Sequence, residues 1–87
     1  MTPDWFTATK AEQRAVIAVI DEGKRQIDEE HRPDGYNVGF NAGSAAGQTE
    51  MHLHVHVIPR FRGDVPDPRG GVRHVIPSKA NYLSRDA

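Results

Sequence analysis

The chain of 87 residues contains no cysteine, no long apolar run and almost no net charge. Without cysteine, neither a disulfide framework nor thiol chemistry is available, and a reducing cytosol is compatible with the sequence. No apolar run approaches the ~20 residues that a membrane span needs, and the N-terminus lacks the charged-then-apolar layout of a signal peptide. We therefore expect a cytoplasmic protein with no membrane partner.

The net charge of −1 disfavours a general binder of polyanions, but the charges are unevenly distributed. Residues 1–34 carry eight acidic and five basic residues, a net −3, whereas residues 35–87 carry four acidic and six basic residues, a net +2. Nucleic-acid binding usually requires a clustered stripe of Lys and Arg. The basic half suits a small phosphorylated ligand better, and we expect no nucleic-acid partner.

With 37% hydrophobic residues, the chain is expected to form one small domain, residues 1–87, with a marginal core. Thr9 and Glu12 have the capping-box spacing that begins a helix. Apolar residues then recur with a helical period over residues 16–27, and the Pro-Asp-Gly sequence at 33–35 ends the pattern. This stretch predicts one long amphipathic helix whose apolar stripe faces the core.

The most informative stretch is residues 52–58, His-Leu-His-Val-His-Val-Ile. Alternation with a period of two is typical of a half-buried strand, and histidine at every second residue matches no helical period. Leu53, Val55 and Val57 would face the core, while the three histidines would line the opposite face about 6.6 Å apart at the usual strand rise. A second strand over residues 36–41 would pair antiparallel with the histidine strand.

Three interpretations of the histidine row remain open. A purely structural row is compatible with partial burial of histidine. A zinc site would use a His-x-His pair, but His52 and His56 would lie about 13 Å apart on a regular strand, too far to share one ion; further ligands would have to come from His31, His74 or a carboxylate. In the catalytic interpretation, which we favour, a neutral imidazole attacks phosphorus while a flanking histidine binds oxygens or meets the leaving group. We assign no metal ligand.

Residues 41–49, Asn-Ala-Gly-Ser-Ala-Ala-Gly-Gln-Thr, precede the histidine row and are small and polar. Glycines there allow backbone N–H groups to approach a phosphate closely. An Asn, then Gly-Gln-Thr, then alternating histidines resembles the signature of the histidine triad nucleotide hydrolase and transferase superfamily. The following Ile-Pro-Arg at 58–60 and Gly-Asp at 63–64 are similar to its branch of dinucleoside polyphosphate hydrolases. The resemblance covers roughly residues 5–82.

This resemblance implies an α+β fold with one long helix packed on an antiparallel sheet. Family members ordinarily carry further strands before the helix, whereas here the predicted helix begins close to Met1. Fewer than three strands rarely stand alone, and exposed edges and apolar faces require cover. Because the family is typically dimeric, we expect a short version of the fold whose sheet is completed in a homodimer.

The resemblance also implies hydrolysis or nucleotidyl transfer at the α-phosphate of a dinucleoside polyphosphate or a nucleoside phosphoramidate. His54 would be the nucleophile, with its other ring nitrogen tied to a backbone carbonyl. No cofactor would be required, and magnesium would accompany a polyphosphate substrate. The expected substrate-binding residues are Asn41, Gly47, Gln48, Thr49, His52 and His56.

Two alternatives are carried beside this one. A catalytically degenerate nucleotide-binding or regulatory module would keep the phosphate site without turnover, and a zinc-binding protein would use the histidines as ligands.

Four arginines after the histidine row are further candidates for phosphate contacts: Arg60, Arg62, Arg69 and Arg73.

Overall fold

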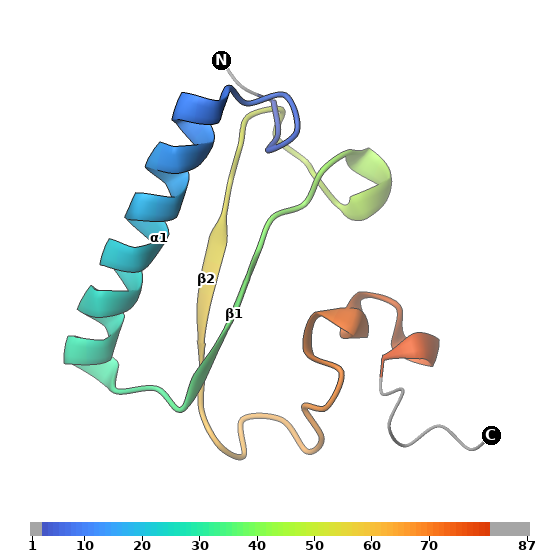
Figure 1. The fold of residues 1–87 in the computed structure, drawn as a ribbon. Coiled ribbons are helices and arrows are strands. Elements are labelled where there is room, and N and C mark those ends of the chain that lie inside the picture. The colour runs from blue at the N-terminus through green and yellow to red at the C-terminus, as the bar shows by residue number, and fades with distance from the viewer. Residues whose placement is uncertain (1–2, 81–87) are drawn as a thin grey trace.

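In the computed structural model, which describes residues 3–80, one long helix lies along one face of a two-stranded antiparallel sheet (Figure 1). The helix and strands are α1 (Lys10–His31), β1 (Gly35–Gly39) and β2 (His56–Arg60), with short 3-10 turns at Ser44–Ala46, Gly71–Val75 and Pro77–Lys79. The expected α+β class, the long helix and the antiparallel strand pair are therefore confirmed. No helix within residues 3–80 is long and apolar enough to cross a bilayer.

Helix α1 begins with the predicted capping box. The Thr9 hydroxyl accepts the backbone N–H of Glu12 at 3.1 Å, and the Glu12 carboxylate accepts the backbone N–H of Thr9 at 2.7 Å. The helix ends at His31, because Arg32 adopts a left-handed conformation with φ 49° and Pro33 cannot continue the helical hydrogen bonds. The imidazole of His31 lies in the last turn, where a positive charge is favourable.

The apolar face of α1 lies against the inward-facing residues of the histidine segment. A groove of about 430 Å³ between them is lined from the helix by Val16, Val19 and Ile20 and from the other side by Leu53, Val55 and Val57. Leu53, Val55 and Val57 are half-buried, as the alternation predicted. The packing is thin, because Ala80, at 4% exposure, is the only buried residue among the described residues.

A polar contact fixes the C-terminal end of α1 to the sheet. The Tyr36 hydroxyl of β1 donates to the Asp28 carboxylate of α1 at 2.5 Å. Burial of the phenol, together with the adjacent Asp28 carboxylate, raises the pKa of Tyr36 to about 12. The helix and the first strand are thus joined at the end opposite to the capping box.

Both strands differ in extent from the predictions. β2 begins at His56 rather than at residue 52, and β1 ends at Gly39 rather than at residue 41. In the register of the sheet Gly39 pairs with His56, so residues 52–55 have no paired strand within residues 3–80. The period-two exposure of the side chains extends back from β2 to Leu53, whereas His52 is half-buried like Leu53. The ladder of hydrogen bonds that defines a strand stops at His56.

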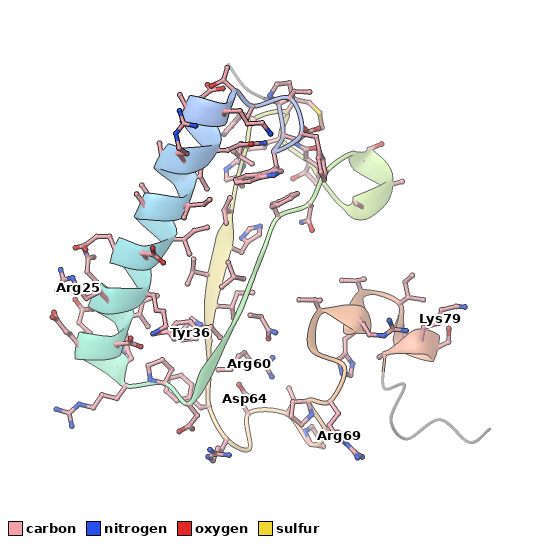
Figure 2. The ribbon with its side chains drawn as sticks, in the orientation of Figure 1. Arg25, Tyr36, Arg60, Asp64, Arg69 and Lys79 are labelled. Atoms are coloured by element: carbon pink, nitrogen blue, oxygen red, sulfur yellow. The ribbon has the colours of Figure 1, made fainter. Side chains whose placement is uncertain are left out.

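The loop after β2 is held by a charged pair. Figure 2 shows Arg60 and Asp64 beside each other, and the Arg60 Nε donates to the Asp64 carboxylate at 2.8 Å. The Arg60 guanidinium and the backbone N–H of Phe61 hold the pKa of Asp64 well below its usual range. Arg60 also donates to the Asn37 side chain of β1, which ties the loop to the sheet.

Candidate active site

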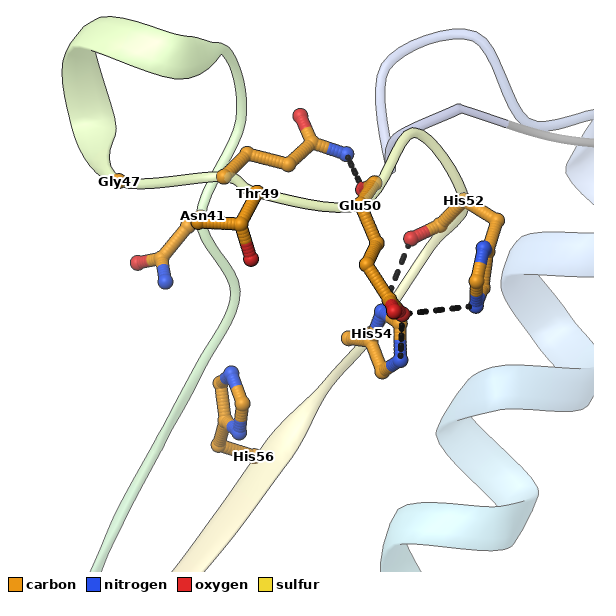
Figure 3. Close-up of a pocket in the computed structure, with 8 residues that line it drawn as sticks. Asn41, Gly47, Thr49, Glu50, His52, His54 and His56 are labelled. Atoms are coloured by element: carbon orange, nitrogen blue, oxygen red, sulfur yellow. Dashed lines mark hydrogen bonds and ion pairs between the residues drawn. The ribbon is translucent and has the colours of Figure 1, made fainter.

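The three histidines of the row border one cavity of about 160 Å³ (Figure 3). The cavity lies between the segment that follows β1 and the segment that leads into β2. Its lining residues are Asn41, Gly47, Gln48, Thr49, Glu50, His52, His54 and His56. All seven residues predicted from the sequence are therefore brought together, and the eighth, Glu50, is an addition.

The orientation of His54 defines its chemistry. Its Nδ1 lies 3.0 Å from the backbone carbonyl oxygen of His52. A carbonyl oxygen only accepts, so Nδ1 carries the proton, and in the neutral ring Nε2 keeps a free lone pair. The side chain is 50% exposed, which leaves this nitrogen accessible from the cavity. The central histidine thus lines the cavity, with its Nε2 3.5 Å from the Glu50 carboxylate, rather than lying beneath packed aliphatic residues.

The histidines do not form the regular row that strand geometry predicted. The ring centroids of His52 and His54 are 4.4 Å apart and the planes are tilted by 39°, closer than the ~6.6 Å expected from the rise of a regular strand. The two rings converge because residues 52–55 lie outside β2. His56, the first residue of β2, lies apart from both rings in Figure 3.

The glycine-rich loop is braced by its own hydrogen bonds. The backbone N–H of Gly47 donates to the Ser44 carbonyl at 3.0 Å, and that of Gln48 donates to the Gly43 carbonyl at 3.1 Å. The Gln48 side chain accepts the Gly43 N–H at 2.7 Å. Gly43 and Gly47 both have φ 92°, a conformation that favours glycine. These groups shape the loop, and Asn41 and Thr49 are among the polar side chains that line the cavity with the histidines.

Glu50 is the lining residue that sequence reasoning missed. Its Oε2 lies 3.5 Å from the Nε2 of His52 and 3.5 Å from the Nε2 of His54. The sequence does carry a signal, because Glu50 continues the period-two spacing of the histidines by one step toward the N-terminus.

The arginines and His74 lie elsewhere. Arg60 is paired with Asp64, Arg69 with Asp67 at 3.0 Å, and Arg62 approaches Asp34 at 4.0 Å. The Nε of Arg73 donates to the Lys79 carbonyl at 3.2 Å, and the Nε2 of His74 lies 3.0 Å from the Arg69 carbonyl. None of the four arginines lines the histidine cavity, so the geometry gives no support to their expected phosphate contacts.

Comparison of the sequence with known protein families shows the family to which the chain belongs. The HIT domain matches residues 1–63, which include the whole cavity. The chain belongs to the HIT family. The resemblance inferred from Asn41, Gly47-Gln48-Thr49 and the alternating histidines is thereby confirmed.

Curated relatives of this HIT chain are longer proteins. It is 46% identical over 57 residues to the AP-4-A phosphorylase of Mycobacterium tuberculosis, a match that covers 64% of this chain and 29% of that enzyme. It is 28% identical over 67 residues to the nitrilase and fragile histidine triad fusion protein of Caenorhabditis elegans, covering 77% of this chain and 15% of that protein. The chain thus spans less than a third of the length of these relatives.

Solved structures support the same fold. A Hit-like protein from Bartonella henselae superposes with a TM-score of 0.66 at 28% identity, covering 70% of this chain and 45% of that one. A hypothetical histidine triad nucleotide-binding protein from Sulfolobus tokodaii superposes with a TM-score of 0.55 at 35% identity, covering 75% and 44%. The helix and two-stranded sheet therefore correspond to part of a HIT-like fold.

Proposed function

We propose that this HIT chain is a nucleotide hydrolase or nucleotidyl transferase acting at the α-phosphate of its substrate, with His54 as the nucleophile. The observation that carries the proposal is the contact between the Nδ1 of His54 and the His52 carbonyl. It fixes the tautomer whose Nε2 lone pair faces the cavity, which is the form that attacks phosphorus. A dinucleoside polyphosphate or a nucleoside phosphoramidate is the proposed substrate class.

The proposed reaction has two displacements. In the first, the Nε2 of His54 bonds to the α-phosphorus, and the bond from phosphorus to the leaving oxygen or nitrogen breaks. The leaving group departs with a proton, which His56 would provide from the neighbouring side of the cavity. In the second, water attacks the phosphorus and gives a proton to His56, which restores the protonated His56. The bond between phosphorus and the Nε2 of His54 breaks, the nucleoside monophosphate leaves and neutral His54 is restored. Two easier steps replace one difficult step.

The remaining lining residues would bind and orient. The amide of Asn41 and the hydroxyl of Thr49 are donors for the nonbridging phosphoryl oxygens. His52 would orient the nucleophile through its backbone carbonyl. Gly47 and Gln48 would hold the loop that carries Thr49, through the hydrogen bonds that they make within it.

The relatives support this substrate class, since one is named an AP-4-A phosphorylase.

We also propose that the chain acts in the cytoplasm as a homodimer, in which the partner subunit covers apolar surface that one copy leaves exposed. Magnesium would enter as the counterion of a polyphosphate substrate, bound mainly by its phosphates.

The test is the release of AMP from diadenosine tetraphosphate and from adenosine 5′-phosphoramidate. His54→Ala should lower turnover of both substrates by about a thousandfold or more, because the covalent step is lost. His31→Ala, which removes an exposed histidine at the end of α1, is the matched control and should leave turnover unchanged. Circular dichroism should show the same fold for both variants. Equal turnover by His54→Ala and the parent chain would rule out the assignment.

One alternative is a nucleotide-binding module that keeps the phosphate site without turnover. The cavity volume of about 160 Å³ holds a phosphoryl group, whereas sites for whole small-molecule ligands run to ~300–1,000 Å³. Calorimetry with AMP beside the turnover assay separates the two functions. Binding of AMP with no release of AMP from either substrate would favour the module.

A further inference from the structure

We propose that Glu50, His52 and His54 form a site for one divalent transition-metal ion of the Zn²⁺ class. One ligand atom from each of these residues lies within 4.8 Å of the others. The three side chains converge at one end of the cavity in Figure 3, where Glu50 reaches toward both rings. They are 63%, 44% and 50% exposed, so an ion from solvent reaches them without a change in the fold.

The contact between His54 and Glu50 requires a cation. The Nδ1 of His54 carries the ring proton because it faces the His52 carbonyl. The Nε2 of the neutral ring and the Oε2 of Glu50, 3.5 Å away, are then both acceptors with no hydrogen between them. Two facing lone pairs repel each other unless a proton or a metal ion lies between them. This pair therefore identifies the place where a cation would bind.

The spacing of the Glu50 oxygen from the two imidazole nitrogens fits a tetrahedral ion. Zinc bonds of about 2.0–2.2 Å to nitrogen and oxygen, at tetrahedral angles, put neighbouring ligand atoms about 3.4 Å apart. The Glu50 oxygen lies 3.5 Å from the Nε2 of each of the two rings. The hydrogen bond at Nδ1 of His54 also matches the usual arrangement of a metal-bound histidine, whose second nitrogen donates to a carbonyl or a carboxylate.

The donor set selects the class of metal. Two imidazoles and one carboxylate suit zinc, cobalt and copper, whereas magnesium and calcium prefer oxygen ligands alone. The sequence argued against a zinc site because His52 and His56 would lie too far apart along a regular strand to share one ion. The structure removes that objection. In the structure His56 takes no part, and Glu50 supplies the third ligand.

The consequence for catalysis rests on the proposed function. A metal ion bound to the Nε2 of His54 occupies the lone pair that would attack phosphorus. Metal and phosphoryl group would therefore exclude each other, and free Zn²⁺ would inhibit turnover by competing with the nucleotide.

The experiment titrates the chelator-treated chain with Co²⁺ and follows the visible absorption of the bound ion, then displaces Co²⁺ with Zn²⁺. We expect one ion per chain and a tetrahedral spectrum. Glu50→Gln and His52→Ala should each weaken Co²⁺ binding at least tenfold. His56→Ala should not weaken it. Asp21→Asn on α1 is the control for the loss of one exposed negative charge and should bind Co²⁺ as the parent chain does.

Equal Co²⁺ affinity in Glu50→Gln and the parent chain would overturn the proposal, as would an octahedral spectrum or no binding. Absence of metal binding together with a pH-dependent histidine NMR signal that Glu50→Gln alters would show a shared proton only. Because these titrations contain no nucleotide, their result is independent of turnover. Inhibition by Zn²⁺ is read separately, as the ratio of turnover rates with and without the ion.

Discussion

At the scale of single residues, Thr49 and Asn41 are two uncharged polar side chains that line the cavity with the histidines. The backbone N–H groups of Gly47 and Gln48 are already bonded within their loop. Stabilisation of the developing charge on the phosphoryl oxygens would therefore depend more on the two side chains than on the glycine-rich backbone.

Thr49→Val tests that dependence, because it keeps the shape of the side chain and removes its hydroxyl. We expect kcat/KM for AMP release to fall by about tenfold to a hundredfold, the range expected for loss of one donor to a transition-state oxygen. Ser44→Ala removes a hydroxyl from the same loop at a position that does not line the cavity, and it should leave kcat/KM unchanged. A loss of the same size in both variants would point to loop structure rather than to phosphate binding.

The sequence predicted every residue of the cavity except Glu50, since the alternating histidines and the Gly-Gln-Thr motif are chemically distinctive. It did not predict how those residues interact. The convergence of His52 and His54 follows from the end of strand pairing at His56, and pairing depends on the partner strand rather than on the residues themselves.

At the scale of elements, α1 was the most predictable part of the chain. Its first residue follows from the reciprocal bonds of Thr9 and Glu12, and its end follows from Pro33. These signals are local, so no knowledge of the tertiary structure was needed. The first and last residues of β1 and β2 were less predictable. Gly39 and His56 form the last pair of the sheet, and that limit depends on how the two strands pair in space.

Thr9→Ala tests the helix start. Loss of the side-chain acceptor for the Glu12 N–H should lower the free energy of unfolding by about 1 kcal/mol. Thr9→Ser keeps the acceptor and should retain most of the stability. Urea unfolding followed by circular dichroism measures both variants, and equal midpoints for Ala and Ser would contradict a capping role.

Asp64→Asn tests the loop after β2 through its pH dependence. The folded-state pKa of Asp64 lies below its unfolded value, so its stabilising effect is present above the unfolded pKa of about 3.9 and is lost as pH falls toward the folded pKa. At pH 7 the variant should melt a few degrees below the parent chain, and the gap should narrow below about pH 4. Asp21→Asn on α1 is the control, and a gap that is constant from pH 7 to pH 2 would contradict the ion pair.

At the scale of the whole molecule, residues 3–80 bury too little apolar surface to form a stable core. Ala80 alone is buried among the described residues, while Phe6, Val19 and Val75 are 72%, 70% and 82% exposed. Apolar surface of this extent marks a contact with another chain or segment. The need for cover was predicted from the presence of only two strands.

The proposed homodimer is tested by sedimentation velocity over a range of micromolar concentrations. We expect a species with twice the mass of one chain, because a two-fold interface buries the same apolar surface on both copies. A single species with the mass of one chain throughout this range would contradict the dimer. That result would leave the chemistry assigned to His54 untouched.

The central claim, that His54 becomes nucleotidylated, is tested most directly by quenching the reaction with diadenosine tetraphosphate at short times and mapping the modified peptide by mass spectrometry. The account predicts one adenylyl group on His54, absent from His54→Ala and retained in His31→Ala. An adenylyl group on His52 or His56 would contradict it, as would AMP release with no modified peptide at any time.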